Sequence, residues 1–174
     1  MDEEKRATRL VLKNAMDLFE KLKWEKARLE NGWGVYDSFN FIVTAHHLYV
    51  DWLKEENGAT EISVAKKNRL PSSIKTIFQA VVDISNGSKH WKLTNKQSLD
   101  RQVVTNVDGP ITGDWWSCLI GGPMVYIDFD SYSASMMEFS ELIVGALTWV
   151  LDAGDDPFPS KLTDWLATLK ITSS

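Results

Sequence analysis

The chain has few of the residues on which strong functional predictions rest. Cys118 is the only cysteine, which excludes an intramolecular disulfide, a cysteine-based zinc site and a Cys–Cys redox pair. The charged stretch MDEEKRATRL at the start lacks the apolar centre of a secretory signal, and no apolar run reaches the roughly 18 residues of a membrane span. We therefore expect a soluble, cytoplasmic protein without a membrane partner.

Basic charge is also scarce. The chain has 19 lysines and arginines against 24 aspartates and glutamates, which gives a net charge of −5. Nucleic-acid-binding proteins normally carry a basic face, so the charge does not favour a nucleic-acid partner, although a local basic groove would permit one. Phosphate-binding glycine motifs, nucleophile elbows and zinc-protease helices are absent. These absences leave enzymatic activity an open question.

Aromatic residues, in contrast, are plentiful. Eight of the 174 residues are tryptophan, and 44% of the chain is hydrophobic. This length suits a single domain with a sizeable core, and side chains as large as tryptophan usually fill cores or interfaces. We predict one domain over residues 1–174.

Hydrophobic periodicity predicts that most of this domain is helical. The predicted helices cover residues 4–30, 36–55, 71 to about 90, 131–154 and 161–170. The segment 36–55 is apolar almost all round, which is typical of a buried central helix. Ser135 and Glu138 form a predicted capping box, Gly154 a C-terminal cap, and Ser160 the cap of the last helix.

The period changes to that of strands at about residue 101. We predict strands at 101–107, 115–120 and 123–129, with a tight turn at Gly121-Gly122. The predicted fold class is α+β and mainly α. It is a bundle of four long helices and a short C-terminal one, with a three-stranded antiparallel β-meander inserted at about 101–130.

Polar residues on the second predicted helix fall on one strip. Asn40, Thr44, His47 and Asp51 recur at i, i+4, i+7 and i+11, which places them within about 60° of one another. On an otherwise apolar helix, such a strip is either the solvent-facing edge or part of a site. Both interpretations stand at the level of sequence.

A second polar row follows on the third predicted helix, provided that the helix continues through Gly87. Its members share one side of that helix and are Thr76, Gln79, Asp83, Asn86 and His90.

If the two rows face each other, they form one polar site. Its catalytic residues would be His47, Asp51, Lys89 and His90, with Asn40, Thr44, Asp83 and Asn86 in binding roles. Imidazole with carboxylate can transfer protons without a cofactor. Alternatively, His47, Asp51, Asp83 and His90 would bind a divalent metal. Lys89 and His90 also have a structural interpretation, because cations near a helix C-terminus complement its dipole.

Two stretches carry a resemblance, YDSFNFIVTAHHLYVDWL at 36–53 and DISNGSKHW at 83–91. They are similar to a group of uncharacterised bacterial and phage helical proteins with an FNF…TAxH…DWL helix followed by a helix ending in NGxKH. The resemblance covers about one-third of the chain and implies no established activity.

The layout is also distantly similar to HEPN domains, helical bundles found in toxins and antiviral ribonucleases. Active HEPN members use an Arg-x(4–6)-His motif at the scissile phosphate. Here the residues at that distance before His90 are Asp83, Ile84 and Ser85, and Lys89 is the adjacent cation. The resemblance therefore implies a binding version of the domain more than an active ribonuclease.

The expected function is that of a binding or regulatory protein, antitoxin-like or immunity-like and associated with phage or defence. A protein partner or a homodimer is the expected interaction, since acidic charge suits a basic partner and aromatic residues suit an interface. The alternatives are a HEPN-like ribonuclease and a metal-binding hydrolase that uses the His/Asp site.

Overall fold

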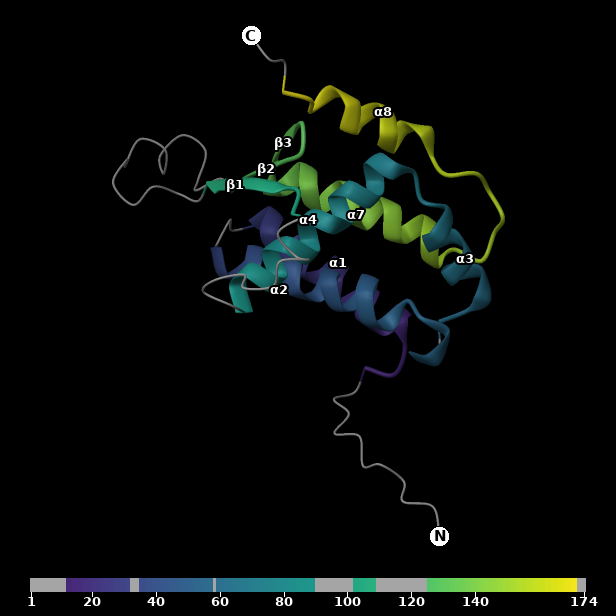
Figure 1. The fold of residues 1–174 in the computed structure, drawn as a ribbon. Helices are drawn as coiled ribbons and strands as arrows, with labels where there is room; N and C mark the ends of the chain where they lie inside the picture. The colour runs from purple at the N-terminus through teal and green to yellow at the C-terminus, as the bar shows by residue number, and fades with distance from the viewer. Residues whose placement is uncertain (1–11, 32–34, 58, 90–101, 109–124, 172–174) are drawn as a thin grey trace.

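The computed structural model describes residues 12–31, 35–57, 59–89, 102–108 and 125–171, and these residues form a mainly helical fold with one small sheet (Figure 1). The helical elements are α1 (Ala15–Asn31), α2 (Val35–His46), the π-helix η1 (His47–Trp52), the 3-10 turn η2 (Glu55–Asn57), α3 (Glu61–Arg69), α4 (Ser72–Lys89), α7 (Met136–Leu151) and α8 (Ser160–Thr168). The strands, inserted between α4 and α7, are β1 (Val104–Asp108), β2 (Tyr126–Phe129) and β3 (Tyr132–Ser135). This confirms the predicted fold class.

The sheet is antiparallel with the order β1-β2-β3. Phe129 pairs with Tyr132 on β3 and with Val104 on β1. The turn between β2 and β3 contains Asp130, whose φ of 51° lies in the left-handed region that Asp tolerates better than most residues do. The observed β2–β3 hairpin is therefore not the predicted one, whose turn at Gly121-Gly122 lies outside the described residues.

The predicted strand at 115–120 also lies outside the described residues. Residues 132–135, which we assigned to the beginning of a helix, form β3 instead. Tyr132 and Ala134 are buried while Ser133 between them is only half-buried, which is typical of a strand packed on a core by one face. The capping box that follows is confirmed, because Ser135 and Glu138 exchange side-chain and backbone hydrogen bonds at the start of α7.

The predicted helix ends need several corrections. Residues 12–14 are not helical, and α1 begins after Asn14, whose Oδ1 accepts the Asp17 N–H at 2.9 Å. The C-cap residue of α7 is Asp152 and not Gly154, and the N-cap residue of α8 is Pro159 and not Ser160. Helix α3 was not predicted, since most of its nine residues are polar or charged and its one sequence signal is the Thr60 cap on Ser63 N–H.

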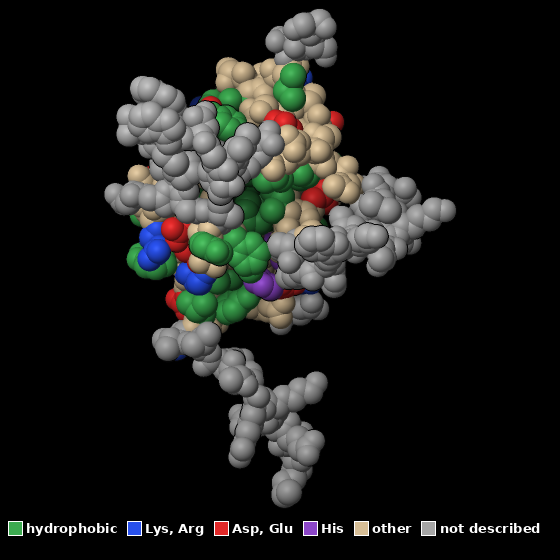
Figure 2. Space-filling view, turned by 90° about the vertical axis from the view of Figure 1, so that its left-hand side faces the viewer, with side chains coloured by type: hydrophobic (Ala, Val, Ile, Leu, Met, Phe, Trp, Pro, Cys, Tyr) green, Lys and Arg blue, Asp and Glu red, His purple; other side chains and the backbone are tan. Residues whose placement is uncertain are grey.

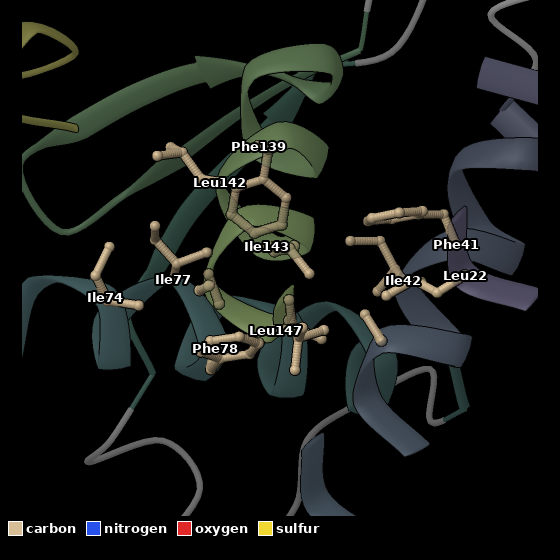
Figure 3. Packing of buried hydrophobic residues seen from close by; sticks show 14 of the residues in the cluster. Leu22, Phe41, Ile42, Ile74, Ile77, Phe78, Phe139, Leu142, Ile143 and Leu147 are labelled. Atoms are coloured by element: carbon tan, nitrogen blue, oxygen red, sulfur yellow. The ribbon is translucent and has the colours of Figure 1, made fainter. Parts of the chain in front are cut away.

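Helix α7 lies at the centre of the core. Figure 3 shows its side chains Phe139, Ile143 and Leu147 between those of α4 and those of α1 and α2. These residues are buried, as are Phe41 on α2 and Phe78 on α4. Burial of such large apolar side chains contributes roughly 1.5–3 kcal/mol each, so the packing of α7 against these helices stabilises the fold.

Candidate functional site

Helices α1 and α2 pack side by side in antiparallel directions. Two cross-helix contacts fix this arrangement. Arg28 pairs with Asp37 near the connection, and Lys21 Nζ donates to Thr44 Oγ1 further from it along both helices. Thr44 is buried in this contact, whereas Asn40, which we placed on the same strip, is exposed. The predicted strip is therefore divided between a helix contact and the outer face of α2.

The far end of the strip forms the one close contact between predicted catalytic residues in the described part of the chain. His47 Nδ1 lies 2.8 Å from Asp51 Oδ2, and each side chain is 45% exposed. Both residues belong to η1, where the Leu53 N–H bonds the carbonyl of Leu48 at 3.0 Å and the helical turn is wider than in an α-helix. The predicted helix 36–55 thus changes type at His47, and π-helical turns occur frequently at functional sites.

Two neighbouring helices hold η1 in place. The Tyr49 ring stacks on Phe78 of α4 at 4.0 Å between centroids, and Lys67 Nζ of α3 lies 4.7 Å from the same ring. Lys67 also donates to the Leu53 carbonyl at 3.1 Å. Burial raises the pKa of Tyr49, and burial together with the nearby Lys54 lowers the pKa of Lys67. These contacts fix the backbone that carries His47 and Asp51.

Asp83, which we placed in the same site, has a different environment. Only 8% of the residue is exposed, and Oδ2 accepts the backbone N–H groups of Val103 at 2.7 Å and Val104 at 3.3 Å. Its other oxygen accepts from Gln79 Nε2 at 2.9 Å. This carboxylate therefore anchors the beginning of β1 on α4.

The remaining predicted residues are only partly described. Helix α4 continues through Gly87, as the second polar row required, and Asn86 is half-buried. The Lys89 side chain and all of His90 lie outside the described residues. Within the described ranges, no group of three or more His, Cys, Asp or Glu side chains is placed to hold a metal ion. The catalytic set and the four-ligand metal site remain predictions.

An exposed aromatic surface lies next to the α1–α2 contact and was not predicted. Tyr36 is 85% exposed, Trp24 60% and Phe39 43%. We call these three residues, with Arg28 and Asp37, the α1–α2 outer face. The composition of segment 36–55 predicted a helix buried all round, and for α2 this prediction is wrong.

The polar members of the α1–α2 outer face order its aromatic part. The Arg28 guanidinium carbon lies 5.0 Å from the centroid of the Trp24 ring, while Nε and Nη2 contact Asp37 Oδ1 at 3.1 and 3.0 Å. Figure 2 shows hydrophobic side chains gathered beside charged ones and a histidine on one side of the molecule. A sequence signal for this surface existed, because Trp24 lies about 200° around the helix from the buried Leu22.

Comparison of the chain with protein-family models, curated proteins and solved structures finds no match. In the described part of the chain, no helix is long and apolar enough to cross a membrane.

Proposed function

We propose that the protein is a binding or regulatory protein that docks a protein partner through the α1–α2 outer face. The observation that carries this proposal is the exposure of Trp24, Tyr36 and Phe39 on two helices that the Arg28–Asp37 ion pair joins, with Arg28 also against the Trp24 ring. Tryptophan, tyrosine and arginine are the residue types enriched among those that dominate the free energy of protein–protein binding. Exposing three large rings without a partner is unfavourable, because it leaves apolar area in contact with water.

The contacts within the face also support docking. Arg28 is held by Asp37 on one side and by the Trp24 ring on the other, so its long side chain is ordered before a partner arrives. Ordering a flexible side chain on binding costs about 0.5–1.5 kcal/mol, and an ordered one avoids much of that cost. We expect Trp24 to enter a pocket of the partner and Arg28 to contact its rim.

A photo-crosslinker tests this proposal. Tyr36 is replaced by benzoylphenylalanine, and a matched chain carries the same group at Tyr126, an exposed tyrosine on β2. After irradiation in the source cells, we expect one protein adduct from position 36, identified by mass spectrometry, and none from position 126. The adduct should disappear when Trp24→Ala is added to the chain with the crosslinker at 36.

Equal labelling from both positions, or an adduct that survives Trp24→Ala, would contradict docking at this face. An adduct made of two copies of this chain would identify the partner as a second copy, which supports the same face in a homodimer.

The hydrogen bond between His47 and Asp51 favours a second candidate, a HEPN-like ribonuclease or another hydrolase. A carboxylate on Nδ1 orients the ring and leaves Nε2 for proton transfer, which is the arrangement of a general base. The test is cleavage of a short RNA by purified protein, with His47→Ala as the active-site variant and Tyr126→Ala, an exposed residue of β2, as the control. Activity that persists in His47→Ala would remove this candidate.

A further inference from the structure

Helices α7 and α8 and the segment that joins them line a partly open cavity. Its volume is about 620 Å³, which is within the range of small-molecule sites. Helix α8 approaches α7 closely at Gly145, where an added Cβ would lie 2.9 Å from Leu162 Cδ2. The walls combine tryptophan, proline and leucine side chains with four charged ones at Glu141, Asp152, Asp156 and Lys161.

One aromatic wall of this cavity is held rigidly. Trp149 is buried, its Nε1–H donates to the Asp156 carbonyl at 2.8 Å, and its ring meets Phe158 edge to face at 5.2 Å. Trp165 of α8 contributes the second indole and is half-buried. An ammonium already lies near the first ring, since Lys66 Nζ is 5.1 Å from the Trp149 centroid. Indole faces attract cations through the charge distribution of the ring.

The charged residues of the cavity are mostly acidic. Glu141 pairs with Lys26 at 2.6 Å, and Asp152 Oδ2 lies 3.7 Å from Lys66 Nζ. Asp156 forms no ion pair with any residue in the described part of the chain, although Lys161 lines the same cavity. Asp156 is therefore the carboxylate with capacity for a charged ligand.

We propose that this cavity binds a small organic cation, an ammonium group carried on an apolar body. The ammonium is placed at Asp156, and the apolar body lies against the indoles of Trp149 and Trp165. Apolar walls supply the favourable burial, and the Asp156 carboxylate selects the sign of the charge. The proposal does not depend on the α1–α2 outer face, which belongs to other helices.

A charge-matched pair of probes tests the assignment. Benzylammonium and benzyl alcohol have nearly the same shape and differ in charge. Each is titrated into the full chain while the indole N–H signal of Trp165, assigned with Trp165→Phe, is followed by NMR. We expect a saturable shift with benzylammonium and an affinity for benzyl alcohol that is lower by about fivefold or more.

Two adjacent carboxylates supply a test variant and its matched control. Asp156→Asn keeps the backbone carbonyl that accepts from Trp149 and should weaken benzylammonium binding by about fivefold. Asp155→Asn removes an equal charge one residue away, on a side chain that pairs with Arg69 and does not line the cavity, and should leave the affinity unchanged.

Equal binding of the two probes, equal weakening by both variants, or no shift up to the solubility of benzylammonium would overturn the assignment. Binding of acetyl-arginine amide about tenfold more tightly than benzylammonium would also overturn it, by identifying a basic peptide as the ligand.

Discussion

Asp83 and Asp51 were predicted for the same site, and the structure places them in opposite environments. Asp83 is buried and accepts three hydrogen bonds from protein donors. Two of them come from the backbone of Val103 and Val104, at the beginning of the strand segment that forms β1. Asp51 is 45% exposed and contacts His47 on the surface of η1. Both aspartates lie on a polar helix row, but Asp83 holds the fold together, whereas Asp51 remains accessible at the surface.

The comparison shows what a helical row does and does not specify. The spacing of polar residues predicts which of them share a side of a helix, and α4 satisfies that prediction because it continues through Gly87. It does not predict which neighbour meets that side. At Asp83 the neighbour is the strand segment, so the carboxylate stabilises the sheet insertion.

Removing Asp83 should have the largest effect. We expect Asp83→Ala to lower the free energy of unfolding by about 3 kcal/mol, because the backbone N–H groups of Val103 and Val104 lose a charged acceptor. For a chain of this size, that corresponds to a fall in Tm of about 6–12 °C. Urea unfolding followed by circular dichroism measures the change.

Asp83→Asn keeps one acceptor oxygen and should lose less stability than Asp83→Ala. Equal stability of wild type and Asp83→Ala would contradict the anchoring role and return Asp83 to the candidate site.

An intermediate effect is expected at Lys26, which is less buried than Asp83 and joins α1 to α7. Burial lowers the pKa of Lys26, but hydrogen bonds with Glu141 and Glu30 outweigh it, and the net pKa is raised. We expect Lys26→Met to cost about 1 kcal/mol at pH 8.

The pH dependence follows from the sign of this shift. A raised folded-state pKa gives stability that is fully present below the unfolded value of about 10.4 and is lost as the pH rises through the folded value. The difference in stability between wild type and Lys26→Met should therefore be constant from pH 7 to 9 and shrink above about pH 10.4. A difference that stayed constant to about pH 11 would show that lost packing, and not the ion pair, causes it.

The smallest effect is expected at His47 and Asp51. A double-mutant cycle with His47→Ala and Asp51→Ala should give a coupling free energy of about 0.5 kcal/mol or less, because water screens an exposed pair. The free energies of unfolding of wild type, the two single variants and the double variant are measured at low and high salt. A coupling above about 2 kcal/mol would mean that this pair, like Asp83, mainly stabilises the fold.

Much of the fold could be predicted from the sequence, because long apolar periods and local caps act within one element. The α7 capping box at Ser135 and Glu138 is an example. The type change at His47 and the existence of α3 could not be predicted in this way. They depend on contacts between elements, such as Tyr49 on Phe78 and Lys67 on the Leu53 carbonyl.

The candidate site was predictable to a smaller extent. The pairing of His47 with Asp51 follows from their spacing of four residues, which one helical face allows. The role of Asp83 required knowledge of where the strand segment docks. Trp24 was visible as a large apolar residue away from the buried face of its helix, but its exposure depends on the packing of α2.

The affinity of Trp24→Ala for the partner captured at position 36 tests the proposed docking face most directly. We expect the dissociation constant to rise by about 30-fold, as for a dominant interface residue, while the free energy of unfolding stays within about 0.5 kcal/mol of wild type. Tyr126→Ala should change neither quantity. An affinity of Trp24→Ala within twofold of wild type would contradict docking through the α1–α2 outer face.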